Sequence, residues 1–271
     1  MPSAVPVSSV RDALAAAELS LRAAGCDTPR LDAELLIAHA IGVPREALFL
    51  APDGGVPPAA ARRVMEWVRR RAAREPVAYI LGVKGFRRLE LRVDRRVLIP
   101  RPETELLVEA ALSLPAGVLV HDVGTGSGAV ALALRDERPD LVVSASDASP
   151  DALELARANA AALGLDLPLA VGSGLPPGDY DMVLANLPYV REDEWATLEP
   201  EIVRYEPRSA LVSGADGLDA IRSLVAEAAS GTALALEHAP AQAEAVRSLL
   251  VDAETRVDLA GRERVTVGRA P

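Results

Sequence analysis

Short apolar runs that suit β-strands alternate with longer helical patterns from Pro102 to the end of the chain. We expect strands at 118–123, 141–146, 167–171, 181–185, 232–237, 255–259 and 264–267, with helices between the first five, including 128–138 and 150–163. This alternation is typical of βαβ units, in which crossover helices join parallel strands. The last two strands follow each other too closely for a helical crossover, so they should be antiparallel. The pattern predicts an α/β fold with one seven-stranded, mostly parallel sheet.

The first part of the chain has a different pattern. Helical periodicity covers 10–23, 30–40 and 58–73, with glycines and prolines between these runs. Residues 86–99 then alternate apolar and charged side chains, which indicates a β-hairpin with its turn near Asp94 and Arg95. We therefore expect a small all-helical N-terminal domain at 1–85, a β-hairpin linker at 86–100 and the sheet domain at 101–271.

Composition excludes several classes of protein. Half of the residues are hydrophobic, which is enough for a sizeable core. The single Cys26 excludes an internal disulfide, and His39, His121 and His238 lie far apart in the sequence. We therefore expect a metal-free protein. Residues 1–11 lack the pattern of a secretion signal, and no uncharged apolar stretch is long enough to span a membrane, so a cytoplasmic location is expected.

The charge of the chain is negative but uneven. A net charge of −10 argues against direct binding of DNA, because neutralised phosphates supply most non-specific affinity for nucleic acids. Residues 1–85 carry 11 basic and 9 acidic side chains, whereas residues 86–271 carry 18 and 30. Six arginines crowd the third predicted helix: Arg62, Arg63, Arg69, Arg70, Arg71 and Arg74. The expected buried stripe of this helix is Val64, Trp67, Val68 and Ala72. Its arginine face has two interpretations, a solvated surface or a contact with an acidic or RNA-containing partner.

A glycine-rich loop follows the first predicted strand and consists of Gly124, Thr125, Gly126, Ser127 and Gly128. Glycines permit a tight turn and let a ligand approach the backbone closely. The spacing G-x-G-x-G differs from the G-x-G-x-x-G of pyrophosphate cradles, which favours a nucleoside cofactor without a diphosphate. Asp147 ends the second strand, where its carboxylate can accept hydrogen bonds from both ribose hydroxyls. On the glycines alone, a dinucleotide-binding fold remains an alternative.

The tetrapeptide Asn186, Leu187, Pro188, Tyr189 ends the fourth strand and suits a planar NH2 group. The side-chain oxygen of Asn186 can accept one N–H and a nearby backbone carbonyl the other, which leaves the lone-pair face of the nitrogen free. Pro188 restricts Leu187 to extended conformations and so aims its carbonyl, and Tyr189 offers an aromatic plane for stacking. The glycine loop, Asp147 and this tetrapeptide should meet at the carboxyl edge of one sheet, where open α/β folds bind ligands. Together they predict methyl transfer to nitrogen.

Other polar residues near these motifs have structural interpretations. His121 lies inside a predicted strand, so we expect a hydrogen-bonded structural histidine, and the same holds for His39 and His238. Asp122 either orients the glycine loop or approaches the charged end of the cofactor. No general base is evident near Asn186. None is required, because a nitrogen methylated by a sulfonium donor is strongly acidic and can lose its proton to water.

The sheet arrangement resembles the Rossmann-like methyltransferases, and several segments resemble a narrower family. These are 31–39 (LDAELLIAH), 75–82 (EPVAYILG), 97–109 (VLIPRPETELLVE), 123–134 (VGTGSGAVALAL), 186–190, 205–213 (YEPRSALVS) and 214–219. Together they resemble the peptide chain release factor glutamine N5-methyltransferases over almost the whole chain. The most specific segment is 99–105 (IPRPETE), which generic amino-group methyltransferases lack.

The resemblance implies that the helical N-terminal domain engages a release factor and that the sheet domain uses S-adenosylmethionine. The acceptor would be the side-chain amide of the glutamine in a Gly-Gly-Gln motif. The residues that would bind the cofactor are Gly124, Thr125, Gly126, Ser127, Gly128, Asp147 and Asn186. Asn186, Leu187, Pro188 and Tyr189 would hold the glutamine amide, with Asn186, Pro188 and Tyr189 as the catalytic residues.

The chain departs from the family pattern at three places. Leu187 stands where the family usually has proline, and the resulting Asn-Leu-Pro-Tyr also resembles the tetrapeptide of ribosomal RNA adenine dimethyltransferases. Ser173 follows the third strand at a position that is often acidic in relatives, and His121 and His238 with Ala239 replace residues that are more often apolar or Ile-Gly. Two alternatives therefore stay open: an adenine N6-methyltransferase acting on RNA or DNA, and a cofactor-binding interaction module without catalysis.

Overall fold

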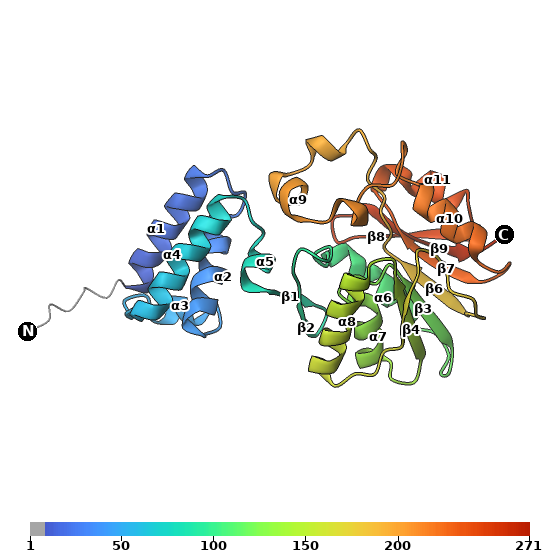
Figure 1. Cartoon of the computed structure of the whole chain (residues 1–271), viewed down its shortest axis with the longest axis horizontal. Helices are drawn as coiled ribbons and strands as arrows, with labels where there is room; N and C mark the ends of the chain where they lie inside the picture. The colour runs from blue at the N-terminus through green and yellow to red at the C-terminus, as the bar shows by residue number, and fades with distance from the viewer. Residues whose placement is uncertain (1–8) are drawn as a thin grey trace, which may run out of the picture. The chain divides into compact units, whose positions relative to one another are not determined.

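The computed structural model describes residues 9–271, and these divide into two compact units (Figure 1). The first unit contains the described residues up to Gly82 together with Pro200–Tyr205, and the second contains Val83–Glu199 and Glu206–Pro271. The expectation that no secretion signal is present concerns residues 1–11, of which residues 1–8 lie outside the described range. In the part of the chain that is described, no helix is both long enough and apolar enough to cross a membrane.

The first unit is helical. Its helices are α1 Val10–Ala23, α2 Pro29–Ile41, α3 Ala47–Leu50, α4 Pro58–Ala72, α5 Val77–Leu81 and α9 Pro200–Tyr205. Helix α1 begins where the Ser9 side chain accepts a hydrogen bond from the backbone N–H of Asp12, and α2 ends at Gly42, which has a φ of 75°. Side chains from α1, α2, α3 and α4 form one core, which includes Leu14, Leu21, Leu36, Ile37, Leu48, Val64 and Val68. The predicted helical character of this part of the chain is confirmed.

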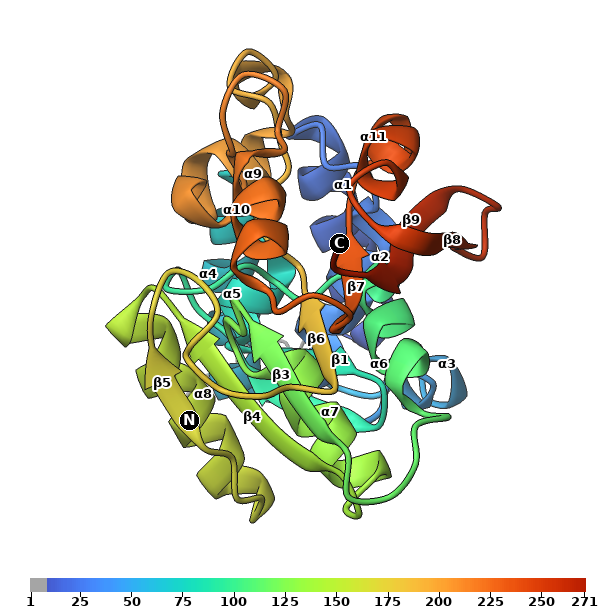
Figure 2. The ribbon, with the colours of Figure 1, turned by 90° about the vertical axis from the view of Figure 1, so that its right-hand side faces the viewer.

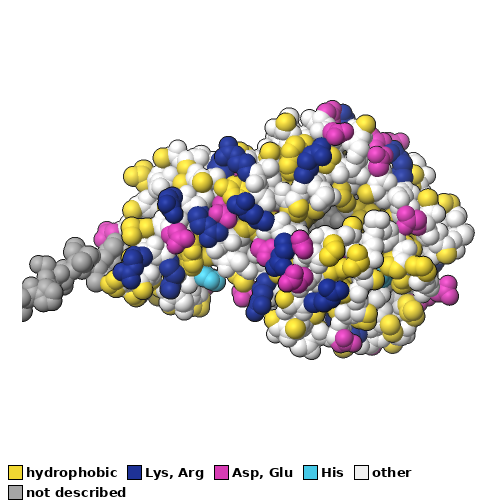
Figure 3. Space-filling view, viewed as in Figure 1, with side chains coloured by type: hydrophobic (Ala, Val, Ile, Leu, Met, Phe, Trp, Pro, Cys, Tyr) yellow, Lys and Arg dark blue, Asp and Glu magenta, His cyan; other side chains and the backbone are white. Residues whose placement is uncertain are grey.

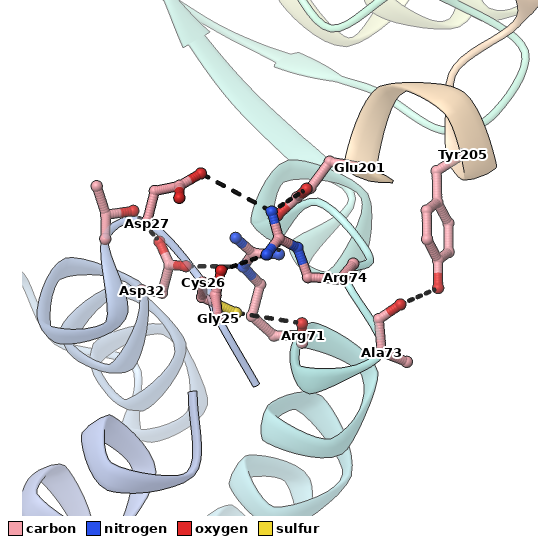
Figure 4. Close-up of polar contacts among 10 residues, drawn as sticks. Gly25, Cys26, Asp27, Asp32, Arg71, Ala73, Arg74, Glu201 and Tyr205 are labelled. Carbon is pink, nitrogen blue, oxygen red and sulfur yellow. Dashed lines mark hydrogen bonds and ion pairs between the residues drawn. The ribbon is translucent and has the colours of Figure 1, made fainter. Parts of the chain in front are cut away.

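Helix α4 buries Val64 and Val68 as predicted, whereas Trp67 and Ala72 are only partly buried. Arg71 is also buried, with 6% of its surface exposed. Its Nε donates to Asp32 at 2.7 Å and its Nη1 donates to Glu201 in α9, also at 2.7 Å (Figure 4). A solvated surface is therefore the wrong interpretation for this arginine.

Two further contacts attach α9 to the other helices of the same unit. Arg74 lies beyond the end of α4, with a φ of 71°, and its Nη2 donates to the second carboxylate oxygen of Glu201 at 2.6 Å (Figure 4). The Tyr205 hydroxyl donates to the carbonyl oxygen of Ala73 at 2.9 Å. Burial opposes ionisation of Glu201, but hydrogen bonds from Arg74 and Arg71 outweigh it and lower the pKa of this carboxyl. A segment that follows the tetrapeptide in sequence is thus anchored by buried ion pairs.

Removing the Glu201 carboxylate is expected to destabilise the helical unit. Glu201→Ala should lower its free energy of unfolding by about 3 kcal/mol, because Arg71 then keeps a buried charge with only half of its ion pairing. Urea unfolding in a Trp195→Phe background, followed by the fluorescence of Trp67, measures this unit. The matched control is Glu199→Ala, an exposed acid next to α9, which should change the value by less than about 0.5 kcal/mol. Equal effects of the two substitutions would contradict a buried anchor.

The remaining arginines of α4 lie at the surface. Arg62, Arg63 and Arg69 are exposed, and Arg70 is paired with Glu75 through two hydrogen bonds of 2.8 Å. In Figure 3 the visible face of this unit shows separate groups of Lys and Arg side chains with acidic side chains between them. Because half of the six arginines are engaged with carboxylates, the basic surface is smaller than the sequence indicates.

In the second unit, seven strands of the described chain form one sheet (Figure 2). They are β3 Leu119–Val123, β4 Val142–Asp147, β5 Leu169–Val171, β6 Met182–Ala185, β7 Ala233–Glu237, β8 Val251–Val257 and β9 Glu263–Arg269, in the order β5-β4-β3-β6-β7-β9-β8. The first five strands pair in parallel, and β9 pairs antiparallel with both β7 and β8. This confirms the predicted α/β fold class. The prediction was wrong at two points: no helix joins β5 to β6, and β8 begins at Val251 rather than at residue 255.

Helices cover both faces of this sheet. They are α6 Glu105–Ala111, α7 Ala129–Glu137, α8 Pro150–Leu163, α10 Asp219–Glu227 and α11 Ala243–Arg247, with 3₁₀ turns at η1 Pro102–Thr104, η2 Trp195–Thr197, η3 Arg208–Ala210 and η4 Pro240–Gln242. Along β6, Met182 and Leu184 join the core beneath α6 and α7, whereas Val183 and Ala185 join the core beneath α10 and α11. Both sides of the strand are apolar, as expected for a parallel strand buried on two faces.

The predicted hairpin is present with a different turn. Its strands are β1 Val83–Phe86 and β2 Leu89–Arg92, so the turn lies at Arg87 and Arg88 rather than near Asp94 and Arg95. Asn159 in α8 joins this hairpin to the glycine loop: it hydrogen-bonds the backbone N–H and carbonyl of Arg92 and donates to the carbonyl of Ser127 at 2.9 Å. The hairpin therefore supports the loop that follows β3.

Candidate active site

The site-forming residues lie at the carboxyl edge of the five parallel strands. Val123 of β3 pairs with both Ser146 of β4 and Ala185 of β6, so the segments that follow these strands start at the same level. This brings the glycine loop, Asp147 and the tetrapeptide together. The predicted meeting of these three motifs at one edge is thus seen in the structure.

A cavity of about 550 Å³ opens at this edge, a size that suits a small cofactor. Its lining includes Gly124, Thr125, Gly126, Ser127, Asp147, Asn186, Leu187 and Pro188. Ser173, whose role the sequence left open, also lines it, as do Asp122 and Thr104. Gly128 and Tyr189 are not among the described residues that line this cavity.

The glycine loop needs its glycines for two reasons. Gly124, Gly126 and Gly128 have φ angles of 73°, 56° and 85°, a region that residues with a Cβ rarely adopt. A Cβ on Gly124 would also stand 3.1 Å from Cδ2 of Leu187. The side chain of Leu187 is buried against the loop, so this residue packs the tetrapeptide onto the glycines.

Asp147 holds the same loop from the end of β4. Its Oδ2 accepts a hydrogen bond from the backbone N–H of Gly126 at 2.8 Å, and its Oδ1 accepts one from Ser149 at 2.8 Å. Each carboxylate oxygen has a further lone pair. The residue can therefore orient the loop and still accept hydrogen bonds from two ligand hydroxyls.

Asp122 is buried between the loop and the sheet. The Thr125 hydroxyl donates to its Oδ2 at 2.6 Å, which supports the interpretation that Asp122 orients the glycine loop. The residue also lines the cavity, so the second interpretation, an approach to the charged end of a cofactor, fits as well. Burial raises the pKa of Asp122 to about 7, against the smaller effect of the Thr125 hydrogen bond.

Two of the three histidines are structural, as predicted. His121 hydrogen-bonds the hydroxyls of Ser144 at 2.8 Å and Ser146 at 2.9 Å, and burial lowers its pKa to about 4, so the ring is neutral. His238 is also buried and hydrogen-bonds Thr266 at 2.8 Å. The prediction was wrong for His39, which is exposed and contacts the ring of Trp67 at 5.8 Å between ring centroids.

The polar groups of Asn186 and Tyr189, the two ends of the tetrapeptide, have different hydrogen-bond partners. Nδ2 of Asn186 donates to the Thr104 hydroxyl at 3.0 Å, and no residue that the structure describes donates to its Oδ1. The Tyr189 hydroxyl donates to Glu237 at 3.3 Å, while the Tyr189 backbone carbonyl accepts from Gln242 at 2.9 Å. The arrangement leaves one amide oxygen at the cavity wall, the acceptor that a planar NH2 group requires.

Thr104 and Glu237 lie near the site but belong to none of the sequence motifs that predicted it. Thr104 lies in the segment 99–105, the most specific part of the family resemblance. Glu237 ends β7, and because Ala185 pairs with Leu236, Asn186 and Glu237 are the next residues on two neighbouring parallel strands. A charged residue at the end of an otherwise apolar strand was the available signal.

Comparisons with known proteins agree with this geometry. Residues 12–82 match the family model described as PrmC N-terminal domain, and residues 102–214 match the methyltransferase small domain. The chain is 42% identical to the release factor glutamine methyltransferase of Deinococcus radiodurans, over 96% of this chain and 98% of the relative. It is 44% identical to the protein of the same name from Burkholderia pseudomallei, over 94% and 96%.

A solved structure shows the same fold at low identity. The catalytic domain of hMettl16, in complex with MAT2A 3'UTR hairpin 6, superimposes with a TM-score of 0.52 at 12% identity, over 77% of this chain and 81% of that one. The likeness at this identity concerns the fold alone. The matches to the sequence relatives cover both units of the chain, and the chain belongs to the release factor glutamine methyltransferase family, a family of S-adenosylmethionine-dependent enzymes.

Proposed function

We propose that this enzyme transfers the methyl group of S-adenosylmethionine to the side-chain amide nitrogen of the glutamine in the Gly-Gly-Gln motif of a peptide chain release factor. The observation that carries the proposal is the free Oδ1 of Asn186 at a cavity that also contains the glycine loop and Asp147. A cytoplasmic location follows from the proposed partner, because release factors act in translation.

The residues at the cavity fit the cofactor. Glycines with positive φ expose the backbone to a ligand, and Asp147 keeps lone pairs for the ribose hydroxyls. Gly124, Thr125, Gly126, Ser127, Gly128 and Asp147 would hold the nucleoside, with Asn186 at the methyl end. S-adenosylmethionine supplies a methyl group activated by its sulfonium charge.

The tetrapeptide would hold the acceptor. Oδ1 of Asn186 accepts one N–H of the glutamine amide, and a backbone carbonyl that Pro188 orients accepts the other. With both hydrogens held, the lone-pair face of the nitrogen is directed along the line of the displacement, so catalysis comes mainly from alignment. Stacking of the amide on the ring of Tyr189 would need this ring at the cavity, and Tyr189 is not among the described residues that line it. The surplus proton passes to water.

The helical unit would engage the release factor. Its exposed arginines Arg62, Arg63 and Arg69 offer donors for acidic groups, whereas Arg70, Arg71 and Arg74 are occupied by carboxylates of the chain itself. This reduced basic surface gives an RNA contact through 62–74 little support. The negative net charge of 86–271 similarly argues against DNA as the substrate.

Methyl incorporation measured side by side separates the candidate functions. The purified enzyme is incubated with labelled S-adenosylmethionine and, in parallel, with release factor, protein-free RNA and protein-free DNA. We expect label in the release factor alone. Label in RNA or DNA would favour the adenine methyltransferase, and cofactor binding by calorimetry with no label in any substrate would favour the interaction module.

A further inference from the structure

A chain of buried polar groups begins at the cavity wall, where Asn186 and Thr104 lie, and ends at Glu237. Nδ2 of Asn186 donates to the Thr104 hydroxyl at 3.0 Å, and the Tyr189 hydroxyl donates to Oε1 of Glu237 at 3.3 Å. The Thr104 hydroxyl also lies close enough to the Glu237 carboxyl to act against the rise of its pKa. Thr104 is 4% exposed and Glu237 is 1% exposed. The two ends of the tetrapeptide, Asn186 and Tyr189, are therefore both tied to one buried acid.

The direction of each hydrogen bond in this chain follows from counting protons. An ionised carboxylate only accepts, so the single hydroxyl proton of Thr104 goes to Glu237. Thr104 must then accept from its other neighbour, which forces the NH2 of Asn186 toward Thr104. The amide oxygen consequently faces the cavity. Without the acid, Thr104 could donate to Asn186 instead, and the amide could turn its NH2 toward the acceptor.

We propose that Glu237 is a positioning residue for methyl transfer: through Thr104 it fixes the amide of Asn186 with Oδ1 toward the acceptor, and it anchors Tyr189 by the hydroxyl. The identity of the acceptor rests on the proposed function. The positioning role of Glu237 concerns only the orientation of the Asn186 side chain, and this orientation suits any acceptor with a planar NH2 group. The pairing of β6 with β7 supplies the register, because Asn186 and Glu237 directly follow the paired residues Ala185 and Leu236.

A stabilising role alone does not explain a glutamate here. Its Oε2 is buried and has no hydrogen-bond partner among the described residues, and none of the described ion pairs includes Glu237. An unpaired buried carboxylate oxygen costs free energy of folding. Glu237 is thus a buried acid with only part of its hydrogen-bonding capacity used. Its effect on the orientation of its neighbours gives a reason for a glutamate at this position.

The protonation of Glu237 gives the proposal a pH dependence. Burial raises the pKa of its carboxyl to about 7, and Glu103 adds to this, whereas the hydroxyls of Thr104 and Tyr189 and the charge of Arg264 act in the opposite direction. Below this pKa the acid carries a proton that it can donate to Thr104, which removes the constraint on Asn186. The turnover number should therefore rise with pH through about 7 and level off above it.

Thr104 offers a matched pair of variants for the test. Thr104→Val keeps the shape but removes the hydroxyl, and it should lower kcat about 10- to 100-fold while KM for S-adenosylmethionine changes less than about twofold. Thr104→Ser keeps the hydroxyl and should retain kcat within about threefold.

Glu237→Gln should lower kcat as much as Thr104→Val does, and the rise of kcat near pH 7 should disappear. Equal losses in the valine and serine variants would overturn the proposal. So would a pH step that persists in Glu237→Gln, because it would then belong to Asp122, whose pKa burial also raises to about 7.

A spectroscopic measurement separates this proposal from the proposed function. The side-chain amide signals of Asn186, assigned through Asn186→Asp, are recorded by NMR in the enzyme without any acceptor. Thr104→Val should shift both amide proton signals and speed their exchange with water, and Thr104→Ser should leave them near their original positions. Unchanged signals in Thr104→Val would contradict the positioning role even if the release factor is methylated. Shifted signals together with an unmodified release factor would instead contradict only the identity of the acceptor.

Discussion

Replacement of Asn186 by alanine is expected to lower kcat for glutamine methylation by about 10³-fold, while the enzyme still binds S-adenosylmethionine within about threefold of the original affinity. The alanine removes the amide oxygen that faces the cavity, so the acceptor nitrogen loses one of its two fixed hydrogen bonds. The glycine loop and Asp147 keep their own contacts, since none of these involves the Asn186 side chain. Steady-state kinetics and calorimetry measure the two effects separately.

The matched control for this substitution is Ser209→Ala. Ser209 lines the same cavity but has no contact with the tetrapeptide in the described hydrogen bonds. It should keep kcat within about twofold. Full activity of Asn186→Ala would contradict the role of the Asn186 amide oxygen in holding the acceptor. An equally large loss of kcat in Ser209→Ala would show that any change in the cavity wall has the same effect.

Replacement of Gly217 by alanine is expected to lower the free energy of unfolding by about 3 kcal/mol and to reduce kcat as well. Gly217 has a φ of 78°, and a Cβ there would stand 2.1 Å from the carbonyl oxygen of Tyr189 and 2.6 Å from Nε2 of Gln242. Neither neighbour can move freely, because Gln242 donates to the carbonyls of both Tyr189 and Asp216. The backbone of the tetrapeptide must therefore shift.

A second glycine separates backbone strain from this steric effect. Gly164, the residue that ends α8, has a similar φ of 67°, and a Cβ there would meet no atom within 4 Å. Gly164→Ala should therefore cost only about 1 kcal/mol, the strain of a left-handed conformation, and leave kcat unchanged. Urea unfolding and turnover of the two variants give the comparison. Similar losses of stability and turnover in the two variants would mean that the steric contact of a Cβ at position 217 with Tyr189 does not contribute.

The parts of the fold that could be predicted are those governed by local periodicity. Helix α8 was predicted with its observed bounds because Pro150 begins it, Gly164 ends it and the apolar period between them is regular. Strand β6 was found because its four residues are apolar and lie directly before the tetrapeptide. Both signals lie within one short window of the sequence.

The errors came from positions where tertiary contacts override local signals. The hairpin turn contains Arg87 at a φ of 51°, although neither Arg87 nor Arg88 is a residue typical of such turns. The guanidinium of Arg87 is held there by Glu137, at 2.8 Å, from α7. A contact between residues 50 positions apart leaves no trace in a local pattern.

Contacts between residues far apart in the sequence also explain which groups of the site and of the helical unit could not be predicted. The motifs gave the glycine loop, Asp147 and Asn186, because each follows a recognisable strand. The side chains behind them could not be derived, since the contact of Thr104 with Asn186 joins residues 82 positions apart. The burial of Arg71 likewise depends on Glu201, 130 positions away in the sequence. Spacing within a motif identifies the groups that face the ligand, whereas the groups that orient them are fixed only by the complete fold.

Peptide mass spectrometry of a release factor after incubation with the enzyme and S-adenosylmethionine shows whether the enzyme methylates the glutamine side chain. We expect one added methyl group on the side-chain amide of the glutamine in the Gly-Gly-Gln motif, and no added methyl group when the Asn186→Ala variant replaces the enzyme. An unmodified glutamine after incubation with enzyme that binds the cofactor, or a methyl group on any other residue, would contradict the proposed function.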